Sequence, residues 1–376
     1  MIFLSSKVEF LYLSEEEMIE AGALDMKSCI ETLEEMFVLL SKGDYLLGGP
    51  KRNDHGLMLW FNENEEFPNI PTKGPDRRFM SLISYLGGDF NVVGNKWYGS
   101  NIANIEQGLP RSIHTFTLND KDTGAPLSIM AGNLVSSVRT GAVPGVTAKH
   151  LAKKDAKVIG VVGGGAINQS CIDAIMKAVD GIEKIVLYDI NLEKGQQIAK
   201  KLADKHGVEV EAFDDLDQTI EQSDIITVAT SGAVKPKINT DSIKPGTLII
   251  LTGSADLEED FYRNSRLVSD LWAMHEKWLE DGLNHPAGLD SIDWAMTYQL
   301  LKMINSGDFD SSSVDDLGDI IAGNKQGRKS EDEVIVMLTG GLPTEDAAWG
   351  YRIYQNALEK GLGTKLPLWE NSYLTK

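Results

Sequence analysis

Residues 157–189 read KVIGVVGGGAINQSCIDAIMKAVDGIEKIVLYD, and the rest of the chain can be interpreted outward from them. The segment 158–162 is apolar and uncharged, as expected of a buried parallel strand, and three glycines follow it. Apolar residues then recur at helical spacing over 166–179, and 184–188 is a second apolar run. This order of strand, glycine turn, helix and strand predicts a parallel α/β unit.

The glycine turn also predicts a ligand. Gly163 and Gly165 fit the pattern G-x-G, although the third glycine position holds Asn168. Such glycines let backbone N–H groups approach a pyrophosphate, and the positive end of the following helix faces that anion. Asp189 ends the second strand at about the 20-residue spacing expected of an acid that binds the adenosine ribose. We therefore expect a bound dinucleotide; the alternative is a turn that needs glycine for its geometry alone.

Asp189 also bears on which dinucleotide is bound. No arginine follows it, and its carboxylate would repel a 2′-phosphate, so we expect NAD rather than NADP. Thr230 and Ser231 follow a strand predicted at 225–229, at the carboxyl end where open α/β sheets bind ligands. The residues we assign to the cofactor are Thr140, Gly163, Gly164, Gly165, Ala166, Ile167, Asp189, Thr230 and Ser231.

Composition limits the possible partners. The chain has 376 residues, enough for two domains, and a formal net charge of −20, which argues against nucleic acid or an anionic membrane surface. Its two cysteines make no disulfide framework, and no Cys/His cluster has zinc spacing, so we expect no metal. We see neither a signal-peptide pattern nor an apolar run long enough to span a membrane, and we expect a cytoplasmic protein.

The patterns on either side of the glycine turn differ. Residues 1–130 are predicted to form a mostly antiparallel sheet with helices at the front, one of them at 26–42. A long helix at 133–153, bent or interrupted near Pro144, leads into repeated strand and helix pairs. The fold class is therefore α/β: a Rossmann-type doubly wound parallel sheet plus a second, α+β domain.

The end of the chain is predicted to rejoin the first domain. A strand at 333–337 and a helix at 344–360 have no place in the nucleotide unit, so we expect both to fold back. The domains are then 1–132 with 320–376, which is discontinuous, and 133–319, which binds the dinucleotide.

Four segments, in this order, resemble the ornithine cyclodeaminase/mu-crystallin family: KWYGSN at 96–101, SSVRTGA at 136–142, GGGA at 163–166 and TEDAA at 344–348. The resemblance implies a homodimer built on the sheet of the first domain, which also binds substrate, and an active site in the cleft between the domains. The family includes ornithine cyclodeaminases, ketimine reductases, alanine dehydrogenases and opine-type aminocarboxyethyl-glutamate dehydrogenases.

The resemblance assigns roles to four residues. Arg52 and Arg139 would grip the substrate α-carboxylate, since a guanidinium fork matches a carboxylate. Lys96 would complete this cationic set and hold or move a proton near the reacting carbon and amine. Asp256 would meet the substrate amine; Leu257-Glu258-Glu259 follows it where many cyclodeaminases have a Pro-Gly-rich turn, which is closer to the opine-type branch. A lone arginine or lysine is more often a solvated surface charge.

The expected function is that of an NAD-dependent enzyme that acts at the Cα–N bond of an α-amino acid by hydride transfer, through an imino acid. We favour a net amino-acid dehydrogenase or imine reductase, the opine type included, because of the Asp256 neighbourhood and a loop at 62–78. Two alternatives stay open. One is an ornithine cyclodeaminase, which converts ornithine to proline and ammonia; the other is a non-catalytic, mu-crystallin-like protein that binds a small ligand.

Overall fold

The computed structural model describes residues 7–375, except 62–66, 68, 75 and 231–234. The chain divides into two compact units. Unit 1 comprises Met1–Asp25, Gly43–Val138 and Pro343–Lys376, and unit 2 comprises Met26–Lys42 and Arg139–Leu342. The loop predicted at 62–78 lies partly outside the described residues.

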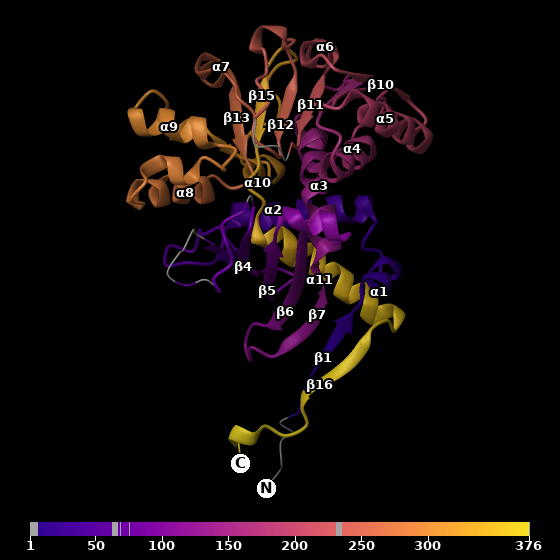
Figure 1. The fold of residues 1–376 in the computed structure, drawn as a ribbon, viewed down its shortest axis with the longest axis vertical. Helices are drawn as coiled ribbons and strands as arrows, with labels where there is room; N and C mark the ends of the chain where they lie inside the picture. The colour runs from indigo at the N-terminus through magenta and orange to yellow at the C-terminus, as the bar shows by residue number, and fades with distance from the viewer. Residues whose placement is uncertain (1–6, 62–66, 68, 75, 231–234, 376) are drawn as a thin grey trace. The chain divides into compact units, whose positions relative to one another are not determined.

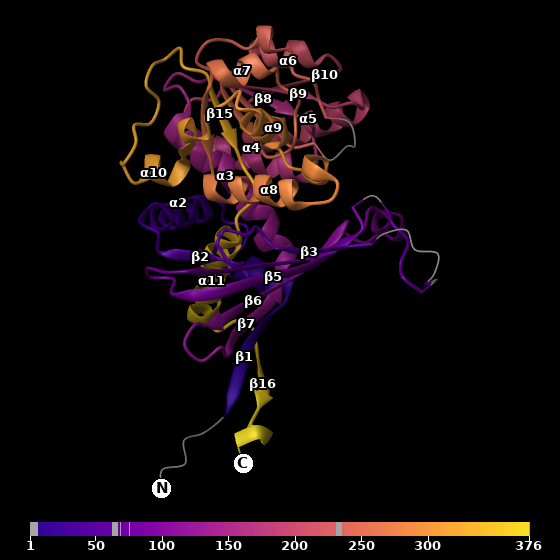
Figure 2. The ribbon, with the colours of Figure 1, turned by 90° about the vertical axis from the view of Figure 1, so that its left-hand side faces the viewer.

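Unit 1 is built on one mixed sheet with the strand order β16-β1-β7-β6-β5-β4-β2, and β3 also pairs with β4. β1 and β7 are parallel, and the other pairs are antiparallel. β1 and β16, from opposite ends of the chain, lie side by side at one edge (Figures 1 and 2). The strands are β1 (Val8–Leu13), β2 (Tyr45–Leu47), β3 (Leu57–Trp60), β4 (Arg78–Leu86), β5 (Val92–Ser100), β6 (Ser112–Asp120), β7 (Pro126–Ala131) and β16 (Thr364–Trp369).

Among the described residues, α1 and α11 are the α-helices that lie wholly within unit 1. α1 (Glu15–Glu20) begins with a capping box, in which Ser14 and Glu17 satisfy each other's backbone N–H groups. α11 (Pro343–Lys360) packs against β4 and β5. The approach is close, because a Cβ placed on Gly94 of β5 would lie 2.9 Å from the Cβ of Ala347. α11 thus covers one face of the sheet and brings its first turn against β5.

Unit 2 is built on a parallel sheet with the strand order β10-β9-β8-β11-β12-β15-β13-β14. The order runs outward in opposite directions from β8 and β11, so the topological switch point, where such folds bind ligands, lies between their carboxyl ends. The strands are β8 (Val158–Val162), β9 (Lys184–Tyr188), β10 (Glu209–Phe213), β11 (Ile225–Val228), β12 (Leu248–Leu251), β13 (Arg266–Ser269), β14 (Asp315–Asp316) and β15 (Ile335–Leu338).

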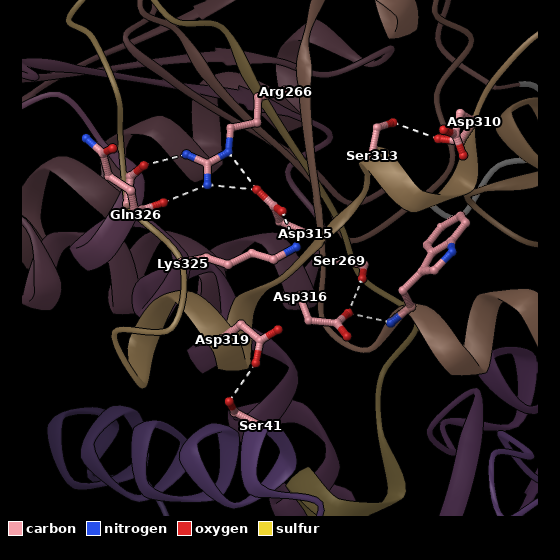
Figure 3. Close-up of polar contacts among 12 residues, drawn as sticks. Ser41, Arg266, Ser269, Asp310, Ser313, Asp315, Asp316, Asp319, Lys325 and Gln326 are labelled. Atoms are coloured by element: carbon pink, nitrogen blue, oxygen red, sulfur yellow. Dashed lines mark hydrogen bonds and ion pairs between the residues drawn. The ribbon is translucent and has the colours of Figure 1, made fainter.

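The helices of unit 2 include one from the N-terminal part of the chain, α2, which packs against α10. Ser41 on α2 donates a hydrogen bond to Asp319 on α10 at 2.6 Å (Figure 3). The described α-helices of unit 2 are α2 (Met26–Lys42), most of α3 (Gly132–Leu151), α4 (Ala166–Ala178), α5 (Leu192–His206), α6 (Leu216–Gln222), α7 (Glu259–Asn264), α8 (Trp272–Asn284), α9 (Tyr298–Ser306) and α10 (Leu317–Ile321). In the described part of the chain, every helix is too short or too polar to span a bilayer.

Three sequence-based expectations need correction. The last predicted strand is β15, which pairs with β12 and β13 and so belongs to the parallel sheet, not to the first domain. Its residues IVML are all buried, as in a strand covered on both faces, and this continuous apolar run was the signal that could have placed it. The segment 26–42 belongs to unit 2. α3 (Gly132–Leu151) runs through Pro144 as one helix, so it is not interrupted there, and the bend near Pro144 stays a prediction. The domain boundaries at 132 and 320 shift accordingly, to 138 and 342.

Candidate functional site

The glycine turn after β8 is tightly packed at Gly163 and Gly164. Gly163 has a φ of +90°, and a Cβ on it would lie 2.9 Å from Cγ2 of Thr230. A Cβ on Gly164 would lie 2.7 Å from Cδ1 of Ile198. Thr230 is half-buried at the end of β11, across the switch point. The turn therefore requires glycine for conformation and for close packing, and it presents backbone where a side chain would otherwise stand.

The N-terminus of α4 is open to an anion. Its N-cap is Gly165, and no side-chain cap bonds its first turn, whereas Asn191 caps α5 and Asp215 caps α6. The first N–H groups of a helix have no partner within the helix, and together with the helix dipole they favour a negative charge. Ala166 is exposed and Ile167 half-buried at this end, and Thr140 is half-buried on α3.

Asn168, at the third glycine position, is fully buried and ties the turn to two strands. Its Nδ2 group donates to the carbonyl oxygens of Val162 at 3.0 Å, Gly163 at 2.8 Å and Thr227 at 3.2 Å. Its Oδ1 accepts from the hydroxyl of Thr227 at 2.8 Å. The missing glycine is therefore no defect in the motif, because hydrogen bonds hold the helix against the sheet where a third glycine would allow close packing.

Asp189 stands where the sequence predicted the acid. It is 7% exposed; Oδ2 accepts from the N–H of Gly164 and Oδ1 from that of Asn191, both at 3.0 Å. Each carboxylate oxygen keeps a further lone pair, so the group can still accept from two ribose hydroxyls. These residues fit an NAD molecule, because the glycine turn, the uncapped N-terminus of α4 and the carboxylate of Asp189 lie together at the switch point. Ser231 lies outside the described residues.

In unit 1, Lys96 lies on β5 and is 3% exposed. Its Nζ forms an ion pair with Asp346 at 2.7 Å and donates to the hydroxyl of Ser136 at 3.1 Å. Asp346 is 1% exposed and lies in the first turn of α11, where the helix dipole favours a negative charge. The sequence led us to expect cations around Lys96, but its partner in this unit is a carboxylate, which stabilises the positively charged form of the amine.

Asp346 is the functional candidate that sequence reasoning missed. The acids Glu345 and Asp346 resemble the solvated charges that often begin a helix, yet both are buried. The signal available was the context, because Ala347, Ala348 and Trp349 follow, and all three are fully buried. A helix whose first turn is enclosed by such residues cannot keep its acids in water, so these acids need partners inside the protein.

In unit 2, Arg139 lies on α3 and is 5% exposed. A Cβ on Gly341 would come within 3.0 Å of its Nη1 atom and 3.6 Å of its Nη2 atom. The guanidinium group thus lies against the bare backbone of a glycine at the end of β15. A buried guanidinium retains its charge and five donors, so this group can bind a carboxylate.

Arg52 and Asp256 are both exposed. Arg52 lies between β2 and β3 with a φ of 61°, a left-handed conformation that is uncommon outside glycine. Asp256 follows β12, and its backbone bridges the chain at Lys237, with its N–H 2.9 Å from the Pro236 carbonyl oxygen. The roles of these two residues stay predictions, whereas the structure brings Lys96 beside Asp346, and Gly163 and Gly164 beside Thr230 and Asp189.

Comparison with known proteins agrees with these features. A family model described as ornithine cyclodeaminase/mu-crystallin matches residues 23–361. The N-((2S)-2-amino-2-carboxyethyl)-L-glutamate dehydrogenase of Staphylococcus aureus is 25% identical over 369 residues, which cover 96% of this chain and 99% of that protein. A Delta(1)-pyrroline-2-carboxylate reductase of Bacillus cereus is 31% identical over 251 residues, covering 66% of this chain and 72% of the reductase.

A solved structure extends the comparison to the fold. The Delta(1)-pyrroline-2-carboxylate reductase of Thermococcus litoralis, in complex with NADH and L-proline, is 29% identical with a TM-score of 0.75. The match covers 94% of this chain and 99% of the reductase. It confirms the predicted α/β fold, and the family model confirms the resemblance read from the four segments. The chain belongs to the ornithine cyclodeaminase/mu-crystallin family.

Proposed function

We propose that this chain is an NAD-dependent enzyme that interconverts an α-amino acid and its imino acid by hydride transfer at the Cα–N bond. The observation that carries the proposal is the pair formed by Lys96 and Asp346. Both side chains are almost fully buried, and removing two charges from water is costly, so the fold alone gives no reason to keep them there. Relatives named as dehydrogenases and reductases of amino or imino acids, matched over most of their length, support the same chemistry.

The cofactor we propose is NAD(H). Asp189 is available to the adenosine ribose and would repel a 2′-phosphate. The relative from Thermococcus litoralis, solved with NADH, supports this choice. When bound, the nicotinamide accepts or supplies the hydride, and the protein contributes orientation and charge.

The residues of this chain then have the following roles. Arg139 and Arg52 hold the α-carboxylate of the substrate, and Asp256 opposes the positive charge of its amine or imine. Lys96, kept charged by Asp346, holds and transfers the proton at the substrate nitrogen. In the oxidative direction the Cα–H bond breaks and its electron pair leaves with the hydrogen, while the nitrogen loses one proton. The reverse direction adds both to the imine.

The experiment that tests this function follows NADH absorbance and free ammonia together. In one arm, the enzyme receives NAD⁺ with a panel of amino acids that includes L-proline, L-alanine, L-ornithine and N-((2S)-2-amino-2-carboxyethyl)-L-glutamate. In the other, it receives NADH with Δ1-pyrroline-2-carboxylate, or with a keto acid and an amine. Reciprocal changes in NADH are expected for at least one pair.

The other outcomes separate the alternatives. Ammonia released from ornithine with only catalytic NAD⁺, and without net NADH, would show a cyclodeaminase and overturn the net redox reaction. No turnover in any arm, with NADH and a carboxylate ligand still bound, would favour a binding protein.

We also propose that the open face of the unit 1 sheet meets a second copy of the chain. Residues alternate across a strand, so Trp97, beside the buried Lys96, points to the face opposite α11 and is 48% exposed. Phe79 stacks on Trp97 with ring centroids 5.7 Å apart, and both line a cavity of about 470 Å³ with Phe61 and Ile113. Apolar patches of this kind are typical of contact surfaces between proteins.

Light scattering tests the dimer. Trp97→Glu should convert a dimer to a monomer, because a charge would be buried at the contact. Leu283→Glu, a change at a 54% exposed leucine on α8 of unit 2, is the matched control. A monomeric wild-type protein, or a dimer that survives Trp97→Glu, would refute this surface.

A further inference from the structure

At the edge of the unit 2 sheet where β13 and β15 end, one carboxylate joins the two strands. Asp270 directly follows β13, and its N–H donates to the carbonyl oxygen of Leu338, the last residue of β15, at 3.1 Å. Its Oδ2 atom accepts from the N–H of Gly340 at 2.6 Å and from that of Gly341 at 3.0 Å. Asp270 is 1% exposed, so the protein itself fills the amides of this glycine turn.

The other carboxylate oxygen of Asp270 is held as firmly. Oδ1 accepts from the N–H of Leu271 at 2.8 Å and lies 2.9 Å from Nε2 of His275. His275 is fully buried, and its Nδ1 lies 3.2 Å from the hydroxyl of Thr297. The ring of Trp272 stacks on the imidazole at 5.5 Å between centroids. Three backbone N–H groups and the buried His275 ring thus fix the position of the carboxylate.

The glycine turn held by Asp270 is the surface on which Arg139 rests. Gly341 has a φ of +77°, a conformation that glycine adopts readily. A Cβ on it would lie 3.0 Å from Nη1 and 3.8 Å from Cζ of Arg139, tighter than ordinary contact for the nearer atom. The position of the turn therefore limits where the guanidinium can lie.

We infer that Asp270, held by His275, is a positioning residue that fixes the Gly340–Gly341 turn and thereby sets the place of the Arg139 guanidinium for the substrate carboxylate. This inference rests on the proposed function, because the carboxylate is the ligand assigned to Arg139. Asp270 acts through backbone and touches no reacting atom. Loss of Asp270 should therefore weaken substrate affinity and raise KM. The substrate carboxylate is bound equally in the ground state and the transition state, so kcat should not change.

The first test is Asp270→Asn. An asparagine keeps the shape but has one accepting oxygen instead of two, so it cannot accept both from the two glycine amides and from Leu271 and His275. The KM of the imino-acid substrate should rise about tenfold, with kcat and the Kd of NADH unchanged. An unchanged KM in an active, folded variant would overturn the inference.

Asp316→Asn is the matched control. Asp316 is another buried acid beside the same strand ends, and it accepts from the hydroxyl of Ser269 at 2.7 Å and from the N–H of Trp272 at 2.6 Å (Figure 3). Burial raises the pKa of Asp316, so a neutral side chain is a mild replacement there. This control should leave the substrate KM unchanged; an equal rise in both variants would show a general loss of packing and refute a specific role for Asp270.

A double-mutant cycle tests whether Asp270 acts through Arg139. In an Arg139→Lys background, where the guanidinium is already gone, Asp270→Asn should raise KM by less than about twofold further, because coupled residues are not additive. If Asp270→Asn instead raised KM by the same factor in the Arg139→Lys background as in the wild type, the inference would be overturned. If Asp270→Asn does not fold, His275→Phe removes one donor from the carboxylate and should raise KM in the same direction by a smaller factor; no rise would count against the inference.

Amide hydrogen exchange tests the Gly340–Gly341 turn without measuring enzyme activity. The peptide containing Gly340 and Gly341 should exchange faster in Asp270→Asn, and at the wild-type rate in Asp316→Asn, because only the first change weakens the acceptor of these amides from a carboxylate to at most a neutral amide oxygen. Unchanged exchange in Asp270→Asn would overturn the inference. Failure of the proposed function would instead be seen in the wild type, as absent turnover with every substrate.

Discussion

Two glycine turns lie at the carboxyl edge of the same parallel sheet, and each gives at least one amide to a buried aspartate. After β8, the N–H of Gly164 bonds to Asp189, and the turn leads into α4, whose first turn has no side-chain cap. After β15, the amides of Gly340 and Gly341 both bond to Asp270. The N-terminus of α4 after the first turn is therefore open to an anion from outside, whereas the protein's own carboxylate occupies both amides of the second turn.

The difference shows how little a glycine pattern says by itself. Both turns need glycine, since Gly163 and Gly341 have φ angles of +90° and +77° and close neighbours on the Cβ side. Asp189 and Asp270 each accept from an amide of one glycine turn, so what marks the first turn as a ligand site is the uncapped N-terminus of α4 that follows it. The first turn should therefore govern cofactor affinity, and the second should govern only the guanidinium beside it.

The largest effect is expected outside both turns, at Lys96. Lys96→Gln should lower kcat by a factor of about 10²–10⁴, the usual contribution of a positioned proton donor, with the Kd of NADH unchanged. The control is Lys121→Gln, because Lys121 pairs with its neighbour Asp122 on a turn. A fully active Lys96→Gln variant would show that Lys96 does not transfer the proton in the proposed mechanism. The roles of the two glycine turns would then be tested by ligand binding alone.

Breaking the first turn should cost cofactor affinity. Gly163→Ala combines an unfavourable φ with a Cβ 2.9 Å from Thr230, and the Kd of NADH should rise about a hundredfold. Gly207→Ala is the matched control, since Gly207 has a φ of +68° but nothing within 4 Å of its Cβ position. The Kd of NADH is measured by fluorescence titration for both variants. Equal affinity would mean that the backbone strain of alanine at a positive φ, and not the loss of the packed turn, causes the effect.

Breaking the second turn should spare the cofactor. Gly341→Ala places a methyl group 3.0 Å from Arg139, so the substrate KM should rise about tenfold while the Kd of NADH stays the same. Gly323→Ala has the same φ of +77° with open space around it, and it should change neither constant. A loss of NADH affinity in Gly341→Ala would abolish the distinction between the two turns.

We assign the choice between the two dinucleotides to Asp189. Asp189→Ser removes the charge that we propose to face the ribose, so the preference for NADH over NADPH should fall about tenfold, with the change seen in both Kd values. Asp215→Ser is the control. Asp215 is the N-cap of α6, and serine can also cap a helix, so this change should leave the preference for NADH unchanged. A preference that survives Asp189→Ser would assign selectivity to other residues.

The sequence alone predicted the features that depend on local pattern. The bounds of α2 and β8, the glycine turn and the place of Asp189 all follow from hydrophobic period and spacing within a few dozen residues. These signals are local because a helix face or a strand–turn–helix unit is completed by neighbours in sequence.

The features that escaped prediction are contacts between distant parts of the chain. Lys96 and Asp346 come from separate segments of unit 1, and no local sequence pattern around either residue indicates that the two form an ion pair. β15 joins the parallel sheet through its pairs with β12 and β13, although its sequence neighbours include α11 of unit 1. Asn168 departs from the motif locally, and only its contact with Thr227 on β11 explains why it is tolerated.

The smallest effect is expected at Cys171, on α4 behind the open turn. Its side chain is fully buried, and burial raises the pKa of the thiol from 9.0 to about 12. The thiol is thus protonated at neutral pH, and native protein should not react with iodoacetamide at this residue, as mass spectrometry of the alkylated peptide would show. Labelling of Cys171 in Gly163→Ala but not in Gly207→Ala would mean that α4 loosens when its turn is broken.

The same thiol gives a pH dependence whose sign follows from the raised pKa. The unfolded thiol ionises near 9.0 and the folded one near 12, so the unfolded state binds fewer protons between these values. The contribution of Cys171 to stability is complete below about pH 9 and is lost as the pH rises towards 12. The urea midpoint of the wild type should therefore fall more steeply over this range than that of Cys171→Ala, and parallel curves would show that α4 does not keep its thiol from water.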